Sequence, residues 1–125
     1  MEEIYSIRGA VSVEMDSPEA VDSAVKELFS TILKENELKE EELSFVLFSQ
    51  THDIRTRNAA AAVRKAGYCA SVPLFCVQEA EINGMMEMVI RVLVQVNHKR
   101  KREARMVYLG RTAKLRPDLN EKGRS

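Results

Sequence analysis

An amphipathic helix that begins after Ser17 is the feature that most limits how this chain can fold. Apolar residues recur in pairs every four positions from Ala20 to Leu33, which gives one continuous apolar stripe. Ser17 is a favourable N-cap and Pro18 suits the first helical position, so the pattern predicts a helix from Pro18 to about Lys34. A stripe of this length must be buried against another apolar surface, and the flanking sequence has to supply it.

Extended segments on both sides of the helix can supply that surface. Residues 3–13 alternate between two faces, as a half-buried strand does, and residues 43–49 are mostly apolar and rich in strand-forming side chains. Pro73 cannot donate a backbone hydrogen bond, which predicts that the strand around it lies at a sheet edge or has an interrupted ladder. Asn83-Gly84 signals a turn before the fourth strand. The predicted strands cover residues 3–13, 43–49, 71–77, 86–97 and 105–109.

A short second helix at residues 59–66 completes the expected layout, and Gly67 stops it in the position that favours a left-handed cap. The element order predicts an α+β fold, a single domain with a mixed five-stranded sheet and the helices packed on one face. Residues 1–119 are expected to form this domain, and residues 120–125 a flexible tail.

The last two predicted strands are separated by the basic run of residues 98–102, which is therefore expected to be a hairpin loop. We interpret the run as a solvated turn. The alternative, a nucleic-acid or anionic-surface patch, is weaker because no aromatic residues interleave with the charges.

One face of the fourth strand is apolar from Ile90 to Val96, and we expect self-association to cover it. Arg91, on the opposite face, needs a partner or an anionic ligand.

Charge limits the possible partners. The chain has 125 residues, and its 19 Lys and Arg balance 19 Asp and Glu, which argues against a general nucleic-acid binder. The zero net charge is the sum of an acidic first third and a basic remainder of the chain. An anionic ligand is therefore expected to bind the second part. No apolar stretch is long enough to span a membrane and no secretory signal is visible, so a cytoplasmic protein without a membrane partner is expected.

Common catalytic motifs are absent from the sequence. There is no nucleophile triad and no glycine-rich phosphate loop, and the cysteines and histidines do not form a zinc-ligand spacing, so neither a metal nor another cofactor is expected. Polar residues at buried-looking positions remain as candidates, although each alone is more typical of a structural role. They are Arg8, Cys76, Glu79, Arg91, Tyr108 and Arg116.

Separate blocks around these residues together resemble one family, the small single-domain chorismate mutases that assemble as trimers with a pseudo-α/β-barrel. The blocks occur in the same order and with similar spacing over essentially the whole chain, which makes the joint signal strong although each block is weak alone. They are residues 7–10, 72–79, 90–92, 107–109 and 115–119.

The resemblance implies the one-step pericyclic conversion of chorismate to prephenate, which needs no nucleophile, metal or cofactor. The substrate is a dianion whose ether oxygen gains negative charge as its bond breaks, so the enzyme must hold the reactive shape and direct positive donors at that oxygen. By matched position, Arg91 faces the ether oxygen and a carboxylate, and Arg8 binds near a carboxylate. Glu79, oriented by Arg8, and the Cys76 thiol contact the ring hydroxyl.

The same resemblance implies further substrate contacts and an assembly. Tyr108 would close on a carboxylate and the ring edge, and Arg64 would stand at the pocket mouth. Chorismate would be the small-molecule partner of a homotrimer with active sites between subunits. The substrate-binding residues implied by matched position are Tyr108, Arg64, Leu115, Arg116, Ala60, Phe75 and Leu74.

The sequence departs from the family pattern at the expected pocket mouth. Asn58 stands where a phenylalanine is usual, and Ala61 stands where a Lys or Arg is frequent. Phe75 occupies a position where a small residue is common. We expect these changes to alter substrate affinity more than reaction type, with bulk regained from Phe75 and charge from Arg55 or Arg57.

Two other functions stay open on the sequence. A trimeric deaminase of enamines or imines has a similar subunit fold, but its motifs match this chain less well than the mutase blocks at residues 107–109 and 115–119. A non-catalytic sensor of an aromatic acid is the other alternative, and binding of chorismate without turnover would distinguish it.

Overall fold

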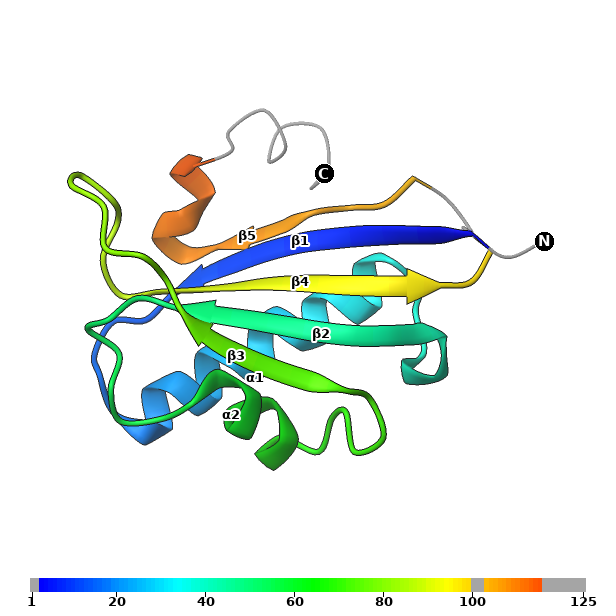
Figure 1. Ribbon diagram of the computed structural model, residues 1–125, viewed down its shortest axis with the longest axis horizontal. Helices are drawn as coiled ribbons and strands as arrows, with labels where there is room; N and C mark the ends of the chain where they lie inside the picture. The colour runs from blue at the N-terminus through cyan, green and yellow to red at the C-terminus, as the bar shows by residue number, and fades with distance from the viewer. Residues whose placement is uncertain (1–2, 100–102, 116–125) are drawn as a thin grey trace.

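A mixed five-stranded sheet with two helices on one face forms this protein, as a computed structural model shows (Figure 1). The structure describes residues 3–99 and 103–115. This architecture confirms the α+β fold that the element order predicts. The strands are β1 (Ile4–Ser12), β2 (Leu43–Gln50), β3 (Leu74–Gln78), β4 (Val89–Asn97) and β5 (Val107–Leu109).

The spatial order of the strands is β3-β2-β4-β1-β5, so β4 lies at the centre and is antiparallel to both β1 and β2. β3 pairs parallel with β2, and β5 pairs parallel with β1. The predicted hairpin between the last two strands is wrong. Because β1 and β2 occupy both edges of β4, β5 takes the outer edge of β1 instead. Residues 100–102 of the basic run lie outside the described residues.

β3 and β4 begin later than the sequence predicts. β3 begins at Leu74 rather than at residue 71, directly after Pro73, and it is an edge strand as that proline indicates. β4 begins at Val89 rather than at residue 86, because the preceding Met88 has a φ of 56°, which is incompatible with an extended strand.

The long helix α1 (Pro18–Glu35) confirms the amphipathic pattern. The Ser17 hydroxyl accepts a bond from the Ala20 N–H at 3.1 Å and so satisfies one unpaired donor of the helix start. The stripe packs closely on Gly9 of β1, where a Cβ would lie 2.8 Å from a β5 carbonyl oxygen and 3.2 Å from the Leu28 side chain. The lack of a side chain at this point therefore lets the helix approach the sheet. The buried residues of the stripe are Val21, Val25, Leu28, Phe29 and Ile32.

The short helix α2 (Ala59–Lys65) lies beside α1 and contacts β2 and β3. Asn58 caps it, because its Oδ1 accepts bonds from the Ala60 and Ala61 N–H groups at 2.8 and 3.2 Å. Gly67 follows the helix with a φ of 95°, which confirms the predicted left-handed stop. Within the described part of the chain, neither helix combines the length and hydropathy that a membrane crossing needs. The 3₁₀ helices are η1 (Glu40–Glu42) and η2 (Gly110–Leu115).

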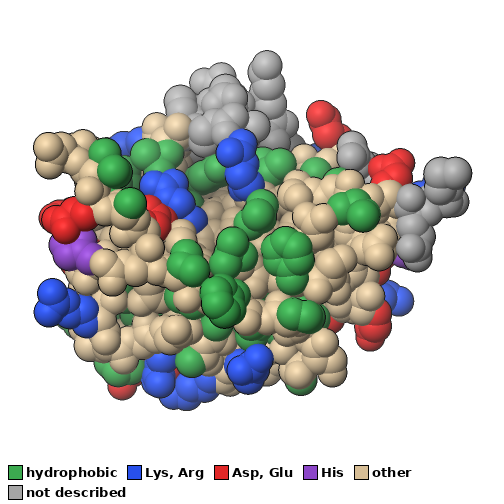
Figure 2. Space-filling model, viewed as in Figure 1, with side chains coloured by type: hydrophobic (Ala, Val, Ile, Leu, Met, Phe, Trp, Pro, Cys, Tyr) green, Lys and Arg blue, Asp and Glu red, His purple; other side chains and the backbone are tan. Residues whose placement is uncertain are grey.

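The two faces of the sheet have different surroundings. The covered face lies toward α1 and α2, and the open face lies opposite. The prediction that self-association covers the apolar residues from Ile90 to Val96 is wrong, because helices of the same chain already bury them on the covered face. On the open face, Figure 2 shows hydrophobic side chains gathered over the middle of the sheet. The exposed large apolar residues of the open face include Phe45, Phe75 and Val77.

Candidate active site

Side chains from four strands meet on the open face. Strand register places Arg91 on β4 between Ser49 on β2 and Ala10 on β1. Ala10 also pairs with Tyr108 on β5, and Arg8 precedes Ala10 on the same face of β1. A pocket of about 260 Å³ opens here, and its lining includes Arg8, Arg91 and Tyr108. The fold therefore brings three of the sequence-predicted site residues together.

Glu79 joins this group from the loop after β3. Its Oε2 accepts a bond from the Ser49 hydroxyl at 2.8 Å and pairs with Arg91 Nε at 2.8 Å. The Glu79 N–H donates to the Gln50 carbonyl oxygen at 2.9 Å, which ties the loop to the end of β2. Because the ion pair uses Arg91 Nε, the two Nη groups can still bind a carboxylate, and Glu79 Oε1 can still accept a hydroxyl.

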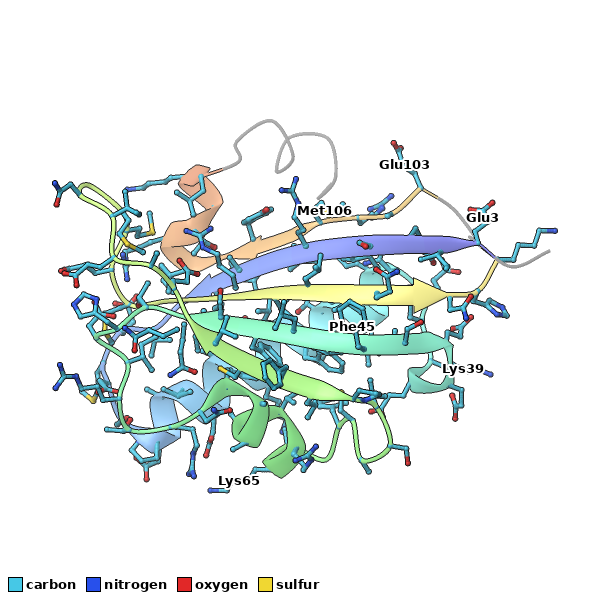
Figure 3. The ribbon with its side chains drawn as sticks, in the orientation of Figure 1. Glu3, Lys39, Phe45, Lys65, Glu103 and Met106 are labelled. Atoms are coloured by element: carbon cyan, nitrogen blue, oxygen red, sulfur yellow. The ribbon has the colours of Figure 1, made fainter. Side chains whose placement is uncertain are left out.

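Arg8 and Tyr108 reach the pocket in different ways. Tyr108 is only 6% exposed and packs in a small cluster with Ala10. The Arg8 side chain is exposed, so the buried position that the sequence suggests for it is wrong in the single chain. Its backbone N–H donates to the sulfur of Met106 at 3.0 Å, just before β5 begins (Figure 3). With Arg91, the pocket holds two guanidinium groups beside one carboxylate, which favours an anionic ligand.

A second group of predicted residues surrounds the edge strand β3. Leu74 and Cys76 lie on the covered side of β3 and pack against the core, whereas Phe75 between them is 69% exposed on the open face. Ala60 and Arg64 lie on α2, where Ala60 is half-buried and Arg64 exposed. These five described residues are here called the α2–β3 group. None of them lines the open-face pocket. In the single chain, the predicted site thus falls into two separate groups.

The Cys76 thiol faces a side chain that the sequence does not single out. Its Sγ donates a hydrogen bond to Gln50 Oε1 at 3.2 Å. Burial raises the pKa of this thiol, so it stays protonated near neutral pH and acts as a donor. Burial also raises the pKa of Cys69, to about 12, and this fully buried residue belongs to the hydrophobic core.

At the expected pocket mouth, Asn58 and the two arginines that could restore charge have structural partners. Asn58 caps α2, as described above. Arg57 Nε lies 2.9 Å from Asp22 Oδ1 on α1, and Lys65 Nζ lies 3.2 Å from Asp22 Oδ2. Arg55 is exposed, and its Nε lies 3.5 Å from a carbonyl oxygen of the same loop. The charge of Arg57 is therefore engaged with α1, and Arg55 is the more accessible of these two cations.

The segment after β5 is anchored to β1. The Thr112 hydroxyl donates to a β1 carbonyl oxygen at 3.1 Å, and the Arg111 N–H donates to the Ser12 hydroxyl at 2.9 Å. These bonds hold η2 at the end of β1 and leave the Leu115 side chain exposed at the end of η2. The predicted site residue Arg116 lies outside the described residues.

Ser49 and Gln50 are the site neighbours that sequence reasoning missed. They are the last two residues of an apolar strand and match no motif. Their importance appears only when strand register places Ser49 opposite Arg91. A polar pair at the end of a buried strand was the available signal. Among the residues that the structure describes, no group of three or more His, Cys, Asp or Glu side chains is placed to hold a metal ion.

Known proteins are similar to this chain in sequence and in fold. A family model described as chorismate mutase type I matches residues 4–119. A chorismate mutase from Thermus thermophilus is 39% identical over 118 residues, covering 93% of this chain and 96% of that protein. One from Bacillus subtilis is 36% identical over 118 residues, covering 94% of this chain and 93% of that protein. A solved chorismate mutase from Clostridium thermocellum matches with a TM-score of 0.81 at 29% identity, over 86% of this chain and 96% of its own. The chain therefore belongs to the chorismate mutase type I family.

Proposed function

We propose that the protein converts chorismate to prephenate, at the branch toward phenylalanine and tyrosine. The observation that carries this proposal is the Arg91–Glu79 pair on the open face, beside Arg8 and Tyr108. Orientation and electrostatic stabilisation accelerate a pericyclic rearrangement, and arginines on rigid strands supply both. We place the activity in residues 1–119, in line with the family match over residues 4–119.

Each polar group of the pocket has a task in this proposal. Arg91 uses its Nη groups to bind a substrate carboxylate and to stabilise the ether oxygen as negative charge develops on it. Arg8 binds the dianion near its other carboxylate. Glu79 accepts the ring hydroxyl through Oε1, while Ser49 and Arg91 hold its Oε2 in place. Tyr108 closes the pocket wall against the ring.

We infer that the active site lies between subunits of a homotrimer. The open-face pocket and the α2–β3 group are separate within one subunit, and a second copy seated on the open face would bring them together. The exposed Phe45, Phe75 and Val77 give that face the apolar surface that a subunit contact needs. Light scattering should therefore give a mass of about three times 14.2 kDa, and a monomer at micromolar concentration would contradict this assembly.

The direct test follows the ultraviolet absorbance of chorismate. Purified protein should remove this absorbance at a rate proportional to enzyme concentration, and acid should convert the product to phenylpyruvate, which identifies prephenate. A folded trimer without turnover above the uncatalysed rate would contradict the proposal. Binding of chorismate without turnover would instead support the sensor alternative.

A further inference from the structure

The Gln50 side chain forms contacts that the proposed chemistry does not use. Gln50 is the last residue of β2, and its Nε2 donates to the carbonyl oxygens of Ile54 and Arg57, both at 3.1 Å. Its Oε1 accepts bonds from the Ala59 N–H at 2.9 Å and from the Cys76 thiol at 3.2 Å. A side-chain amide has two donor hydrogens and two acceptor lone pairs, so these bonds use its full capacity and determine its orientation.

These contacts join the loop before α2, the first residue of α2, and β3. α2 has 7 residues, so it depends on outside contacts for its stability. The first N–H groups of a helix need acceptors, and Gln50 accepts from the first while Asn58 accepts from the next two. Loss of the Gln50 amide would thus leave α2 capped by Asn58 but would release its start from β3.

We propose that Gln50 is a positioning residue for substrate binding, because it holds the α2–β3 group, including Ala60 and Arg64, in one arrangement. This inference rests on the proposed function, which brings that group to the pocket of a neighbouring subunit. Glu79, beside Arg91, is bonded to Gln50 through main-chain atoms alone, so a side-chain substitution keeps that contact. Loss of the Gln50 amide should therefore change KM rather than kcat.

Chorismate kinetics of Gln50→Met test the proposal, because methionine keeps the side-chain length and removes the hydrogen bonds. Gln78→Met is the matched control, since Gln78 pairs with Gln50 across the strands and its side chain bonds to no described residue. We expect KM to rise about tenfold in Gln50→Met, with kcat within about twofold of wild type, and no change in the control. Gln50→Glu should recover little of the loss, because the oxygen that replaces Nε2 cannot donate to the Ile54 and Arg57 carbonyl oxygens.

An unchanged KM in Gln50→Met, or a lower kcat at constant KM, would overturn the proposal. Hydrogen exchange of the wild-type protein keeps it testable if the variant does not fold. The Ala59 amide should exchange slowly, and exchange at the rate of an unprotected amide would also overturn it. In a Cys69→Ala protein, the S–H stretching band of Cys76 should report a hydrogen-bonded thiol. The band of a free thiol would show that Cys76 does not bond to Gln50 and would overturn the proposal.

The two proposals fail in different ways. A wild-type protein without chorismate turnover contradicts the proposed function. Slow Ala59 exchange with a hydrogen-bonded Cys76 thiol would still support the contacts of the Gln50 amide with α2 and β3. Fast Ala59 exchange in an active enzyme contradicts the role of Gln50 and leaves the proposed function standing.

Discussion

The covered and open faces of the sheet differ most clearly along β4, where successive residues face opposite sides. Ile90 and Val92 are 0% and 4% exposed beneath the helices. Arg91 and Leu93, their immediate neighbours in the chain, are half-buried on the open face. The covered side of this strand is uniformly apolar, whereas the open side alternates polar and apolar groups.

This difference separates stability from chemistry. Apolar side chains on the covered face lose their contact with water and so contribute most of the hydrophobic stabilisation. On the open face, polar groups have partners yet remain accessible, as Arg91 does with Glu79 and Ser6 does with Gln95. For β1, β2 and β4 away from their ends, the face to which a strand position points should therefore decide whether a substitution affects folding or catalysis.

The largest effect is expected for Phe48→Ala on the covered face. Phe48 lies on β2 and is 0% exposed, and removal of its ring leaves a cavity in the core. The free energy of unfolding, measured with denaturant, should fall by about 3–5 kcal/mol. Phe75→Ala is the matched control, because Phe75 lies on the adjacent strand and is 69% exposed.

Unfolding at two protein concentrations separates folding from association in this pair. A loss in Phe75→Ala that shrinks as the concentration rises belongs to the contact between subunits, as the proposed trimer requires. If Phe48→Ala lost no more stability than Phe75→Ala at high concentration, the distinction between the two faces would be wrong.

Arg91→Ala should abolish most catalysis and leave folding nearly intact. Loss of a donor to the developing negative charge should cost about 3 kcal/mol of transition-state stabilisation, or at least about a hundredfold in kcat/KM. Arg91→Lys should recover little, because an ammonium group lacks the planar fork of guanidinium. Steady-state kinetics and denaturant unfolding measure the two quantities, and equal kcat/KM in wild type and Arg91→Ala would refute the role of Arg91.

Local sequence patterns predicted the elements whose formation is local. α1 ends at Glu35, next to the predicted Lys34, because its apolar period and its cap lie within the helix itself. The partner of β5 is a long-range property. Residues 98–109 contain no sign that β1 already occupies the edge of β4, so a hairpin was the natural but incorrect interpretation.

For the candidate site too, local sequence patterns do not show contacts that depend on distant parts of the chain. Arg91 could be predicted because a charged residue interrupts an apolar strand, and the family blocks add Glu79 and Arg8. Ser49 and Gln50 could not, because their contacts with Glu79 and Cys76 depend on strand register and on the path of a loop. Burial of the apolar side of β4 likewise follows from the position of α1, which no window within β4 contains.

Gly9→Ala tests how closely the covered face and α1 are packed. The added methyl group would lie 2.8 Å from a β5 carbonyl oxygen and 3.1 and 3.2 Å from the Ile32 and Leu28 side chains. The free energy of unfolding should fall by about 1–3 kcal/mol, because these neighbours must move. Thermal or denaturant unfolding measures the change. An equal or higher stability than wild type would show that α1 yields to the methyl group without strain.

Ser49→Ala should give the smallest effect and the sharpest test of the open face. Its hydroxyl donates to Glu79 Oε2 at 2.8 Å, but Arg91 still holds that carboxylate, so the loss should be about 1 kcal/mol, or about fivefold in kcat/KM. Stability should stay near that of wild type. Ser6→Ala removes a bond of the same length on the same face, to Gln95, and should leave kcat/KM unchanged. Equal losses in both variants would mean that hydrogen bonds on the open face support the sheet in general, and the separation of stability from chemistry would fail.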